Sequence, residues 1–120
     1  MILLSMIFMH ILDDFCLQGI LASMKQKEWW KKQEQYKEMY KHDYIVALFM
    51  HSFSWAFMIM LPLAFALRFD LSTLFLLCFV INLLIHIVVD DLKANKGRIN
   101  LIEDQVVHII QIITTGLVLI

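Results

Sequence analysis

Hydrophobic residues are concentrated in four long runs along this chain. The runs cover residues 1–23, 44–67, 71–92 and 99–120. Each has about the 20 residues that an α-helix needs to cross the hydrocarbon core of a bilayer. The connections at 68–70 and 93–98 are short, which makes neighbouring helices antiparallel. The pattern predicts an all-α protein, a four-helix transmembrane bundle that forms one domain over residues 1–120.

The segment between the first two runs has a different pattern. Residues 25–42 lack Gly and Pro, contain a Glu and a Lys at i,i+4 spacing, and repeat aromatic residues at Trp29, Tyr36 and Tyr40. We expect an amphipathic helix at the membrane interface, with its rings at headgroup depth and its lysines toward anionic lipid. A solvated helical arm without lipid contact is the alternative.

Composition supports a membrane protein. Hydrophobic residues make up 61% of the chain and charged residues 18%, whereas soluble domains are roughly 45–50% apolar. The net charge of -1 excludes a generally basic nucleic-acid binder, so nucleic acid is not an expected partner. The two cysteines lie in separate apolar runs, which indicates neither a disulfide framework nor a thiolate zinc cluster.

The basic residues predict an orientation. Nine of the ten Lys and Arg residues lie in the first and third connections, and Arg68 alone lies in the second. Because cytoplasmic loops carry the excess of Lys and Arg, we expect a multi-pass membrane protein with both termini outside. The first run lacks a basic flank and a cleavage site, so we expect it to remain as a span.

Ionisable residues inside these runs occur in pairs four positions apart. Such residues are costly in a membrane and normally face the bundle interior or a wet cavity. A spacing of four places two side chains on one helical face, about 5–6 Å apart at Cβ. Three of the four runs have a pair: His10 with Asp14, His86 with Asp90, and Asp104 with His108.

The polar faces continue beyond the pairs and reach a common depth. Further polar residues at helical spacing are Gln18, Asn82, Lys93, Gln111 and Thr115, and the second run offers His51. Counted from the expected cytoplasmic ends, the ionisable groups of all four runs lie roughly 8 to 15 Å deep at a rise of 1.5 Å per residue. The pattern therefore predicts one shared site in the cytoplasmic half of the bundle.

Imidazole and carboxylate groups in this arrangement are typical metal ligands. They suit zinc, manganese or non-haem iron, and helical bundles hold two-metal sites of this kind. We expect two ions, or one ion with an acid–base pair. The candidate ligands are His10, Asp14, His51, His86, Asp90, Asp104 and His108. Asp13, Asp91 and Glu103 are neighbours in the sequence that can orient the imidazoles.

Two interpretations without a metal fit the same residues. Each His–Asp pair can be a hydrogen bond or ion pair that joins helices, because buried polar groups need partners whatever their function. The same residue types can also form a proton relay.

Three short motifs carry a resemblance to a known family. They are H-x3-D-F-x-L-Q at residues 10–18, H-x3-D-x2-K at 86–93 and D-Q-x2-H at 104–108. With these motifs the chain resembles an uncharacterised family, a domain of unknown function, of small bacterial and phage inner-membrane proteins. More loosely it is similar to membrane-bound proteins labelled metal-dependent hydrolases. The family supplies no established activity.

The residues themselves favour a membrane-embedded metal-dependent hydrolase that opens to the cytoplasmic leaflet. Bound ions would activate a water molecule and polarise the scissile group, and Asp13 or Glu103 would take the proton. A ring of basic residues at the mouth would attract an anionic substrate, such as a lipid phosphate ester. These residues are Lys25, Lys93, Lys96 and Arg98.

Two other classes of function remain open. A transporter or channel would pass divalent metal ions or protons through the same groups. The runs are nearly all apolar beyond Trp55 and before Asn82, which favours a one-sided site unless a homo-oligomer builds the pore. The other class is a non-catalytic phage or bacterial membrane effector. No G-x-S-x-G, H-E-x-x-H, P-loop or dinucleotide motif is present in the sequence.

Overall fold

The computed structural model of the protein describes residues 1–33 and 38–120. Over these residues the chain is helical and has no strand, which confirms the predicted all-α class. The elements are α1 (Ile2–Ile11), the π-helix η1 (Leu12–Leu17), α2 (Leu21–Met24), α3 (Lys27–Lys31), α4 (Asp43–Ala66), α5 (Thr73–Ala94) and α6 (Leu101–Leu119). Tyr36, part of the expected interfacial helix, lies outside the described residues.

Three helices, α4, α5 and α6, are long and apolar enough to cross a membrane among the described residues. Each lies close to one of the apolar runs of the sequence. The first run is divided instead. Its helix widens into η1, ends at Leu17, and is followed by a turn in which Gly19 adopts a φ of +49°. Glycine has no Cβ and reaches this left-handed conformation without steric cost.

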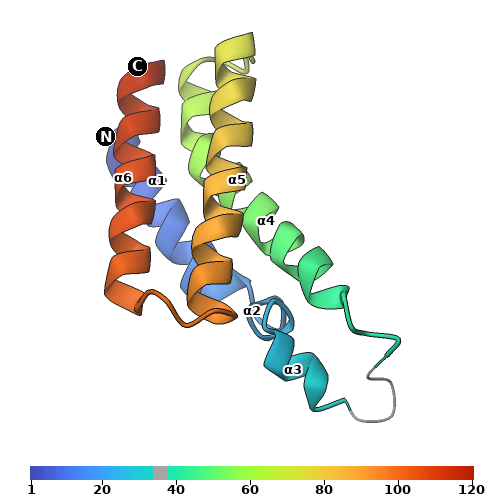
Figure 1. Cartoon of the computed structure of the whole chain (residues 1–120). Helices are drawn as coiled ribbons and strands as arrows, with labels where there is room; N and C mark the ends of the chain where they lie inside the picture. Colours follow the sequence, from blue (N-terminus) through green and yellow to red (C-terminus); the bar gives the residue numbers. More distant parts are fainter. Residues whose placement is uncertain (34–37) are drawn as a thin grey trace.

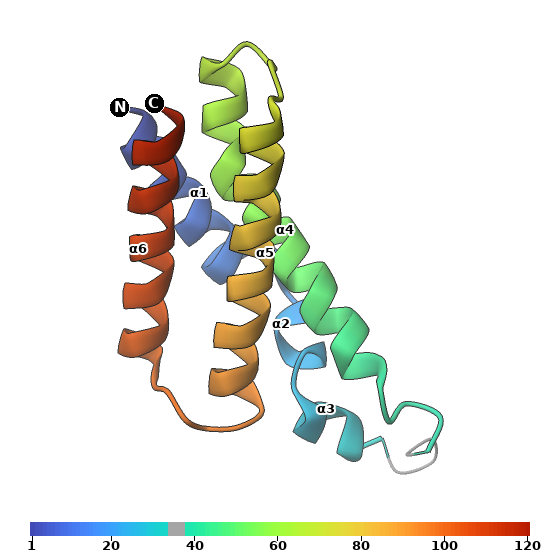
Figure 2. The same ribbon diagram turned by 45° about the horizontal axis from the view of Figure 1, so that its top comes forward.

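The helices lie side by side with their polar residues at one end. α1 packs against α4 and α6, and α5 also packs against both of these helices. α2 packs against α4. Both chain termini lie at one end of the molecule, and α2, α3 and the α5–α6 connection lie at the other (Figures 1 and 2). The segment α2–α3 therefore lies close to the end where α5 finishes and α6 begins.

An apolar core fills the half of the molecule that contains the termini. It comprises Met6, Trp55, Ala56, Ile59, Met60, Leu63, Ala64, Phe75, Leu83 and Ile112. These residues come from the first half of α1 and α5 and from the second half of α4 and α6. Close packing extends to Gly116, where a Cβ would clash with the Leu3 side chain. A glycine there lets α6 approach α1.

The outer surfaces of the helices are also apolar. Exposed residues include Leu4, Phe8, Phe49, Phe57, Ile81, Leu84, Val88, Val106, Ile110 and Leu117. Soluble monomers rarely expose contiguous apolar surface on this scale. Together with the three long apolar helices, this surface is consistent with a membrane protein.

Local hydrogen bonds fix the helix ends next to the polar half. The Asn100 side chain accepts from the Glu103 backbone N–H, and the Glu103 carboxylate accepts from the Asn100 N–H, both at 2.9 Å. This capping box starts α6 directly before Asp104. Gly97, with a φ of +58°, turns the α5–α6 connection.

Candidate metal centre

The polar faces of the helices meet in one buried group of side chains, which we name the polar cluster. Its members are His10 and Asp14 from α1 and η1, Lys25 at the end of α2, His51 and Trp55 from α4, His86, Asp90 and Lys93 from α5, and Asp104, Gln105 and His108 from α6. Side chains from six elements thus converge, and they include the three His–Asp pairs found in the sequence.

Asp90 lies at the centre of the polar cluster and is fully buried. Its Oδ2 lies 2.5 Å from Lys25 Nζ and 2.7 Å from His51 Nε2. Its Oδ1 lies 3.8 Å from His108 Nε2 and 3.9 Å from Lys93 Nζ. One carboxylate therefore contacts groups from α2, α4 and α6.

His86 is held between two aromatic rings. Its imidazole stacks on Trp55 with ring centroids 4.2 Å apart and on His108 with centroids 4.3 Å apart. The Nε2 atom lies 3.2 Å from His51 Nε2 and 3.7 Å from Asp90 Oδ2. Stacking thus fixes the plane of the ring and directs Nε2 toward the other candidate ligands.

The partners of His10 fix its tautomer. Trp55 Nε1–H donates to His10 Nδ1 at 2.7 Å, and an indole is only a donor, so Nδ1 carries the lone pair. The ring proton is then on Nε2, which donates to Gln105 Oε1 at 2.9 Å. Both ring nitrogens are engaged, so His10 acts in this arrangement as a positioning group. Its predicted role as a metal ligand stays a prediction.

Gln105 links three polar groups and is not among the site residues predicted from the sequence. With its oxygen on His10, its amide nitrogen donates to Asp104 Oδ2 at 3.1 Å and to Asp14 Oδ2 at 3.4 Å. The only sequence signal was its place in the D-Q-x2-H motif, because a neighbour of Asp104 lies about 100° round the helix.

The tautomer of His108 follows from a chain of amides. Gln111 Nε2 donates to the Asn82 backbone carbonyl at 3.1 Å, which leaves Gln111 Oε1 to accept from His108 Nδ1–H at 3.2 Å. A neutral His108 then has its lone pair on Nε2. Asn82 also donates to Thr115 Oγ1 at 2.7 Å. These residues belong to the polar faces predicted from the sequence, and they orient His108.

Three electron-rich atoms face each other at this point. His108 Nε2 lies 3.3 Å from Asp104 Oδ1 and 3.8 Å from Asp90 Oδ1. Among the described residues, none of the three atoms has a hydrogen-bond partner. Buried atoms of this kind are costly unless a cation lies between them. A proton on His108 Nε2 or a metal ion between the three atoms would satisfy them.

Two sets of side chains have the geometry of metal ligands. One set is His86, Asp90 and His108, and the other is Asp14, His51 and His86, with the donor atoms of each set within 4.8 Å of one another. Nitrogen and carboxylate ligands bind zinc at about 2.0–2.2 Å, so donor atoms a few ångströms apart can close on one ion. The first set, with Asp104 beside it, fits a metal ion best because Asp90 Oδ1 and His108 Nε2 face each other without a hydrogen-bond partner among the described residues.

A protein-family model covers almost the whole chain. A family model described as "Protein of unknown function (DUF3307)" matches residues 2–120. The chain belongs to this family. The match extends over every element that contributes to the polar cluster. Among curated proteins and solved structures, nothing matches the chain.

In this DUF3307 member, the two predicted catalytic carboxylates have other partners. Asp13 is buried, and its carboxylate accepts from Ser54 Oγ at 2.7 Å and from the Gln18 amide. Glu103 is exposed and caps α6. The π-helix accounts for the contact between Asp13 and Gln18, because it brings residues five apart together. Gln18 therefore lies beside Asp13 and does not extend the His10–Asp14 face.

The four predicted substrate-binding residues lie in two different environments. Lys25 is only 7% exposed and lies inside the polar cluster. Lys93 Nζ lies 2.5 Å from Asp104 Oδ2 at the edge of the cluster. Lys96 pairs with Asp91 at 3.1 Å, and both Lys96 and Arg98 are exposed in the α5–α6 connection. The structure thus brings Lys25 and Lys93 to the candidate ligands.

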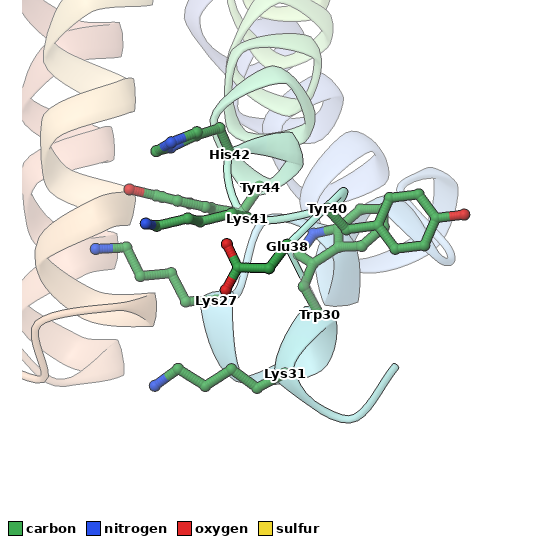
Figure 3. A pocket seen from close by; sticks show the side chains of 8 residues that line it. All are labelled: Lys27, Trp30, Lys31, Glu38, Tyr40, Lys41, His42 and Tyr44. Atoms are coloured by element: carbon green, nitrogen blue, oxygen red, sulfur yellow. The ribbon is translucent and has the colours of Figure 1, made fainter. Parts of the chain in front are cut away.

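A separate hollow lies beside α3, and we name it the arm pocket. It has a volume of about 360 Å³ and is lined by Lys27, Trp30, Lys31, Glu38, Tyr40, Lys41, His42 and Tyr44 (Figure 3). Lys27 Nζ lies 4.8 Å from the centre of the Tyr44 ring, and the Trp30 and Tyr40 rings lie 5.3 Å apart. None of these described lining residues belongs to the polar cluster.

Proposed function

We propose that the protein is a membrane-embedded metal-dependent hydrolase with one ion held by His86, Asp90, Asp104 and His108. The observation that carries the proposal is the position of His108 Nε2, which faces two carboxylate oxygens without hydrogen-bond partners among the described residues in a buried site. A divalent ion satisfies all three atoms. The site suits zinc, manganese or iron, because its donor atoms are nitrogen and oxygen.

The proposal includes the arrangement in the membrane. The helix of α1 and η1 is the fourth span, because it packs against α4 and α6 and exposes Leu4, Phe8 and Phe15 on its outer side. The basic residues near α2, α3 and the α5–α6 connection face the cytoplasm of a bacterial cell, and both termini lie outside. The segment of α3 and the arm pocket lies at the interface.

Each group of the cluster has a chemical role in this scheme. When bound, the ion lowers the pKa of a water molecule and polarises the scissile group. Asp14 is the proton acceptor, because its carboxylate lies within 4.8 Å of a ring nitrogen of the ligand His86. Lys25 and Lys93 supply positive charge for an anionic substrate.

A substrate from the lipid phase suits the surroundings of the site. A groove of about 360 Å³ between α5 and α6 is lined by apolar residues together with Asn82, Gln111 and Thr115. Gln111 contacts His108, so this groove lies one side chain away from the proposed ion. We therefore propose an anionic lipid with a phosphate ester as the substrate class.

A conduit is the second candidate function. The chain from His108 through Gln111 and Asn82 to Thr115 continues the polar cluster toward the end with the termini. Against a conduit, the apolar core there includes Ile59, Leu63 and Ile112, all fully buried. A one-sided catalytic site agrees better with this division.

The decisive experiment measures metal in the detergent-purified protein by inductively coupled plasma mass spectrometry. We expect about one ion per chain in the wild type and loss of that ion in His108→Ala and Asp104→Asn. Asp70→Asn is the control, because Asp70 is exposed in the α4–α5 connection, away from the polar cluster. A metal-free wild type would refute the proposal.

Turnover then separates the two functions. Proteoliposomes that contain a phosphate-monoester lipid should release inorganic phosphate with the wild type and not with His108→Ala. Ion or proton flux without phosphate release would favour the conduit instead.

A further inference from the structure

The geometry points to Lys25 as a tethered cation that occupies a second ion position and so limits the centre to one metal ion. The inference deepens the proposed function and rests on its metal site. It concerns the second ligand set, Asp14, His51 and His86, whose donor atoms lie within 4.8 Å of one another.

The ammonium of Lys25 lies among these ligand atoms. Nζ lies 2.9 Å from His51 Nε2 and 2.5 Å from Asp90 Oδ2. His51 Nε2 in turn lies 3.2 Å from His86 Nε2 and 3.6 Å from Asp14 Oδ1. The ammonium thus bridges a nitrogen and an oxygen that would otherwise face each other as electron-pair donors.

The contact with His51 makes Lys25 and a metal ion mutually exclusive. An ammonium has three donors and no acceptor, so its hydrogen bond uses the lone pair of His51 Nε2. A metal ion would need the same lone pair, at about 2.0–2.1 Å. With His86 kept on the first ion, a second ion would be held by His51, Asp14 and Asp90 Oδ2, since His51 Nε2 lies 2.7 Å from Asp90 Oδ2 and 3.6 Å from Asp14 Oδ1. It can bind there only when the ammonium leaves.

The backbone around Lys25 is fixed to α5. The Lys25 carbonyl accepts from Asn95 Nδ2 at 3.1 Å, and the Lys27 backbone N–H donates to Asn95 Oδ1 at 2.8 Å. Asn95 Nδ2 also donates to Asp91 Oδ1 at 2.8 Å. These bonds hold the end of α2 next to the last turns of α5. The Lys25 side chain therefore extends to Asp90 from a fixed backbone position.

Two consequences follow for the site. A chelator removes the metal ion but leaves a positive charge beside Asp90. An anionic substrate oxygen bound at the ion would also lie near the ammonium, which favours phosphate esters over neutral esters.

The test compares Lys25→Met with the wild type. Both proteins are freed of metal, exposed to Zn²⁺ or Mn²⁺ at increasing ratios, separated from unbound ion and measured by mass spectrometry. We expect Lys25→Met to bind one more ion per chain than the wild type. Lys27→Met is the matched control and should bind as many ions as the wild type, because Lys27 contacts Tyr44.

Two further variants connect the gain to the second set. Asp14→Asn in the Lys25→Met background should remove the added ion and leave the first, because Asp14 belongs to the second set alone. Lys25→Arg should keep the wild-type count, since a guanidinium remains a cation. Size-exclusion chromatography and circular dichroism verify the fold, and Lys25→Gln replaces Lys25→Met if the latter does not fold.

The outcomes separate this inference from the proposed function. Equal ion counts in wild type and in the folded Lys25 variant would overturn the inference, and so would two ions in the wild type. One ion in the wild type and two in the variant supports both proposals. No ion in the wild type and one in the variant supports the role of Lys25 while the proposed one-metal hydrolase fails.

Discussion

Lys25 and Lys27 are two residues apart, yet they belong to different regions of the molecule. The ammonium of Lys25 enters the polar cluster and bonds Asp90 and His51. That of Lys27 lies over the Tyr44 ring in the arm pocket. Both regions contain lysine, carboxylate, histidine and tryptophan side chains.

Burial separates the two regions. In the cluster, Asp90, Asp104, His86 and His108 are fully buried, so each charge needs a partner and each contact has a large energetic effect. In the arm pocket, the pair of Lys31 and Glu28 has side chains 65% and 72% exposed. Water and salt screen such a pair, so its energetic effect is small.

The largest contrast is expected for Asp90→Asn. The change leaves Lys25 and His51 without their charged partner in a buried site, which destabilises by about 3–5 kcal/mol. We expect this loss in SDS-induced unfolding of the detergent-solubilised protein, together with loss of bound metal. Asp70→Asn, at an exposed position in the α4–α5 connection, is the control and should lose less than about 1 kcal/mol. A stable, metal-loaded Asp90→Asn protein would contradict the central position of Asp90.

Removal of the metal ion should have the second-largest effect, and this effect should depend on the polar cluster and not on the arm pocket. A ligand at 100 times its Kd stabilises the folded state by about 2.7 kcal/mol, so chelation should lower the unfolding free energy of the wild type by that order. Variants of the arm pocket, such as Tyr40→Phe, should respond to the chelator as the wild type does. His108→Ala should not respond, and a normal response in that variant would refute His108 as a ligand.

Trp55→Phe should have an intermediate effect on the cluster. The variant keeps an aromatic ring for stacking on His86 but loses the indole N–H that bonds His10. Loss of an orienting partner typically costs 10–100-fold in metal affinity, and we expect a weakening of this order in a competition titration with a chelating dye. Unchanged affinity would mean that His10 and Gln105 do not position the ligands.

Lys27→Ala tests the arm pocket itself. Loss of the contact with the Tyr44 ring should destabilise by about 0.5–1 kcal/mol in the same unfolding assay, as expected of a cation–π contact near the surface. The metal content should stay the same. A loss of metal in this variant would break the separation of the two regions.

Lys31→Ala should have the smallest effect. Its exposed ion pair with Glu28, 2.6 Å between Nζ and Oε1, contributes about 0.2–0.5 kcal/mol at helical spacing. The difference from wild type should vanish in high salt. A larger, salt-insensitive effect would show that the arm is more tightly packed than its exposure indicates.

The long hydrophobic runs predicted the long helices because each run has about the length that a membrane-spanning helix needs. The run at 44–67 became α4 at Asp43–Ala66, and the run at 71–92 became α5 at Thr73–Ala94. The first run was different, because a π-helix and the left-handed Gly19 lie within it. Hydrophobicity records neither feature, since both change backbone geometry and leave the apolar character of the residues unchanged.

The same limit applies to the candidate site. Spacings of four identified His86 with Asp90 and Asp104 with His108, because an α-helix places such residues on one face. They did not identify Lys25 as a member of the cluster or Gln105 as a bridge, since both depend on side-chain reach between elements. The hydrogen bond that occupies His10 Nδ1 comes from Trp55, a residue on another helix.

The π-helix has a consequence for the two adjacent acids that it contains. Asp13 bonds Ser54 and Gln18, whereas Asp14 bonds Gln105 and approaches His51. The extra residue in this turn therefore sets how far α1 is rotated about the helix axis relative to the residues after η1. Deleting one residue from Leu12–Leu17 would rotate the preceding segment by about 100°, and His10 would swing out of reach of Trp55.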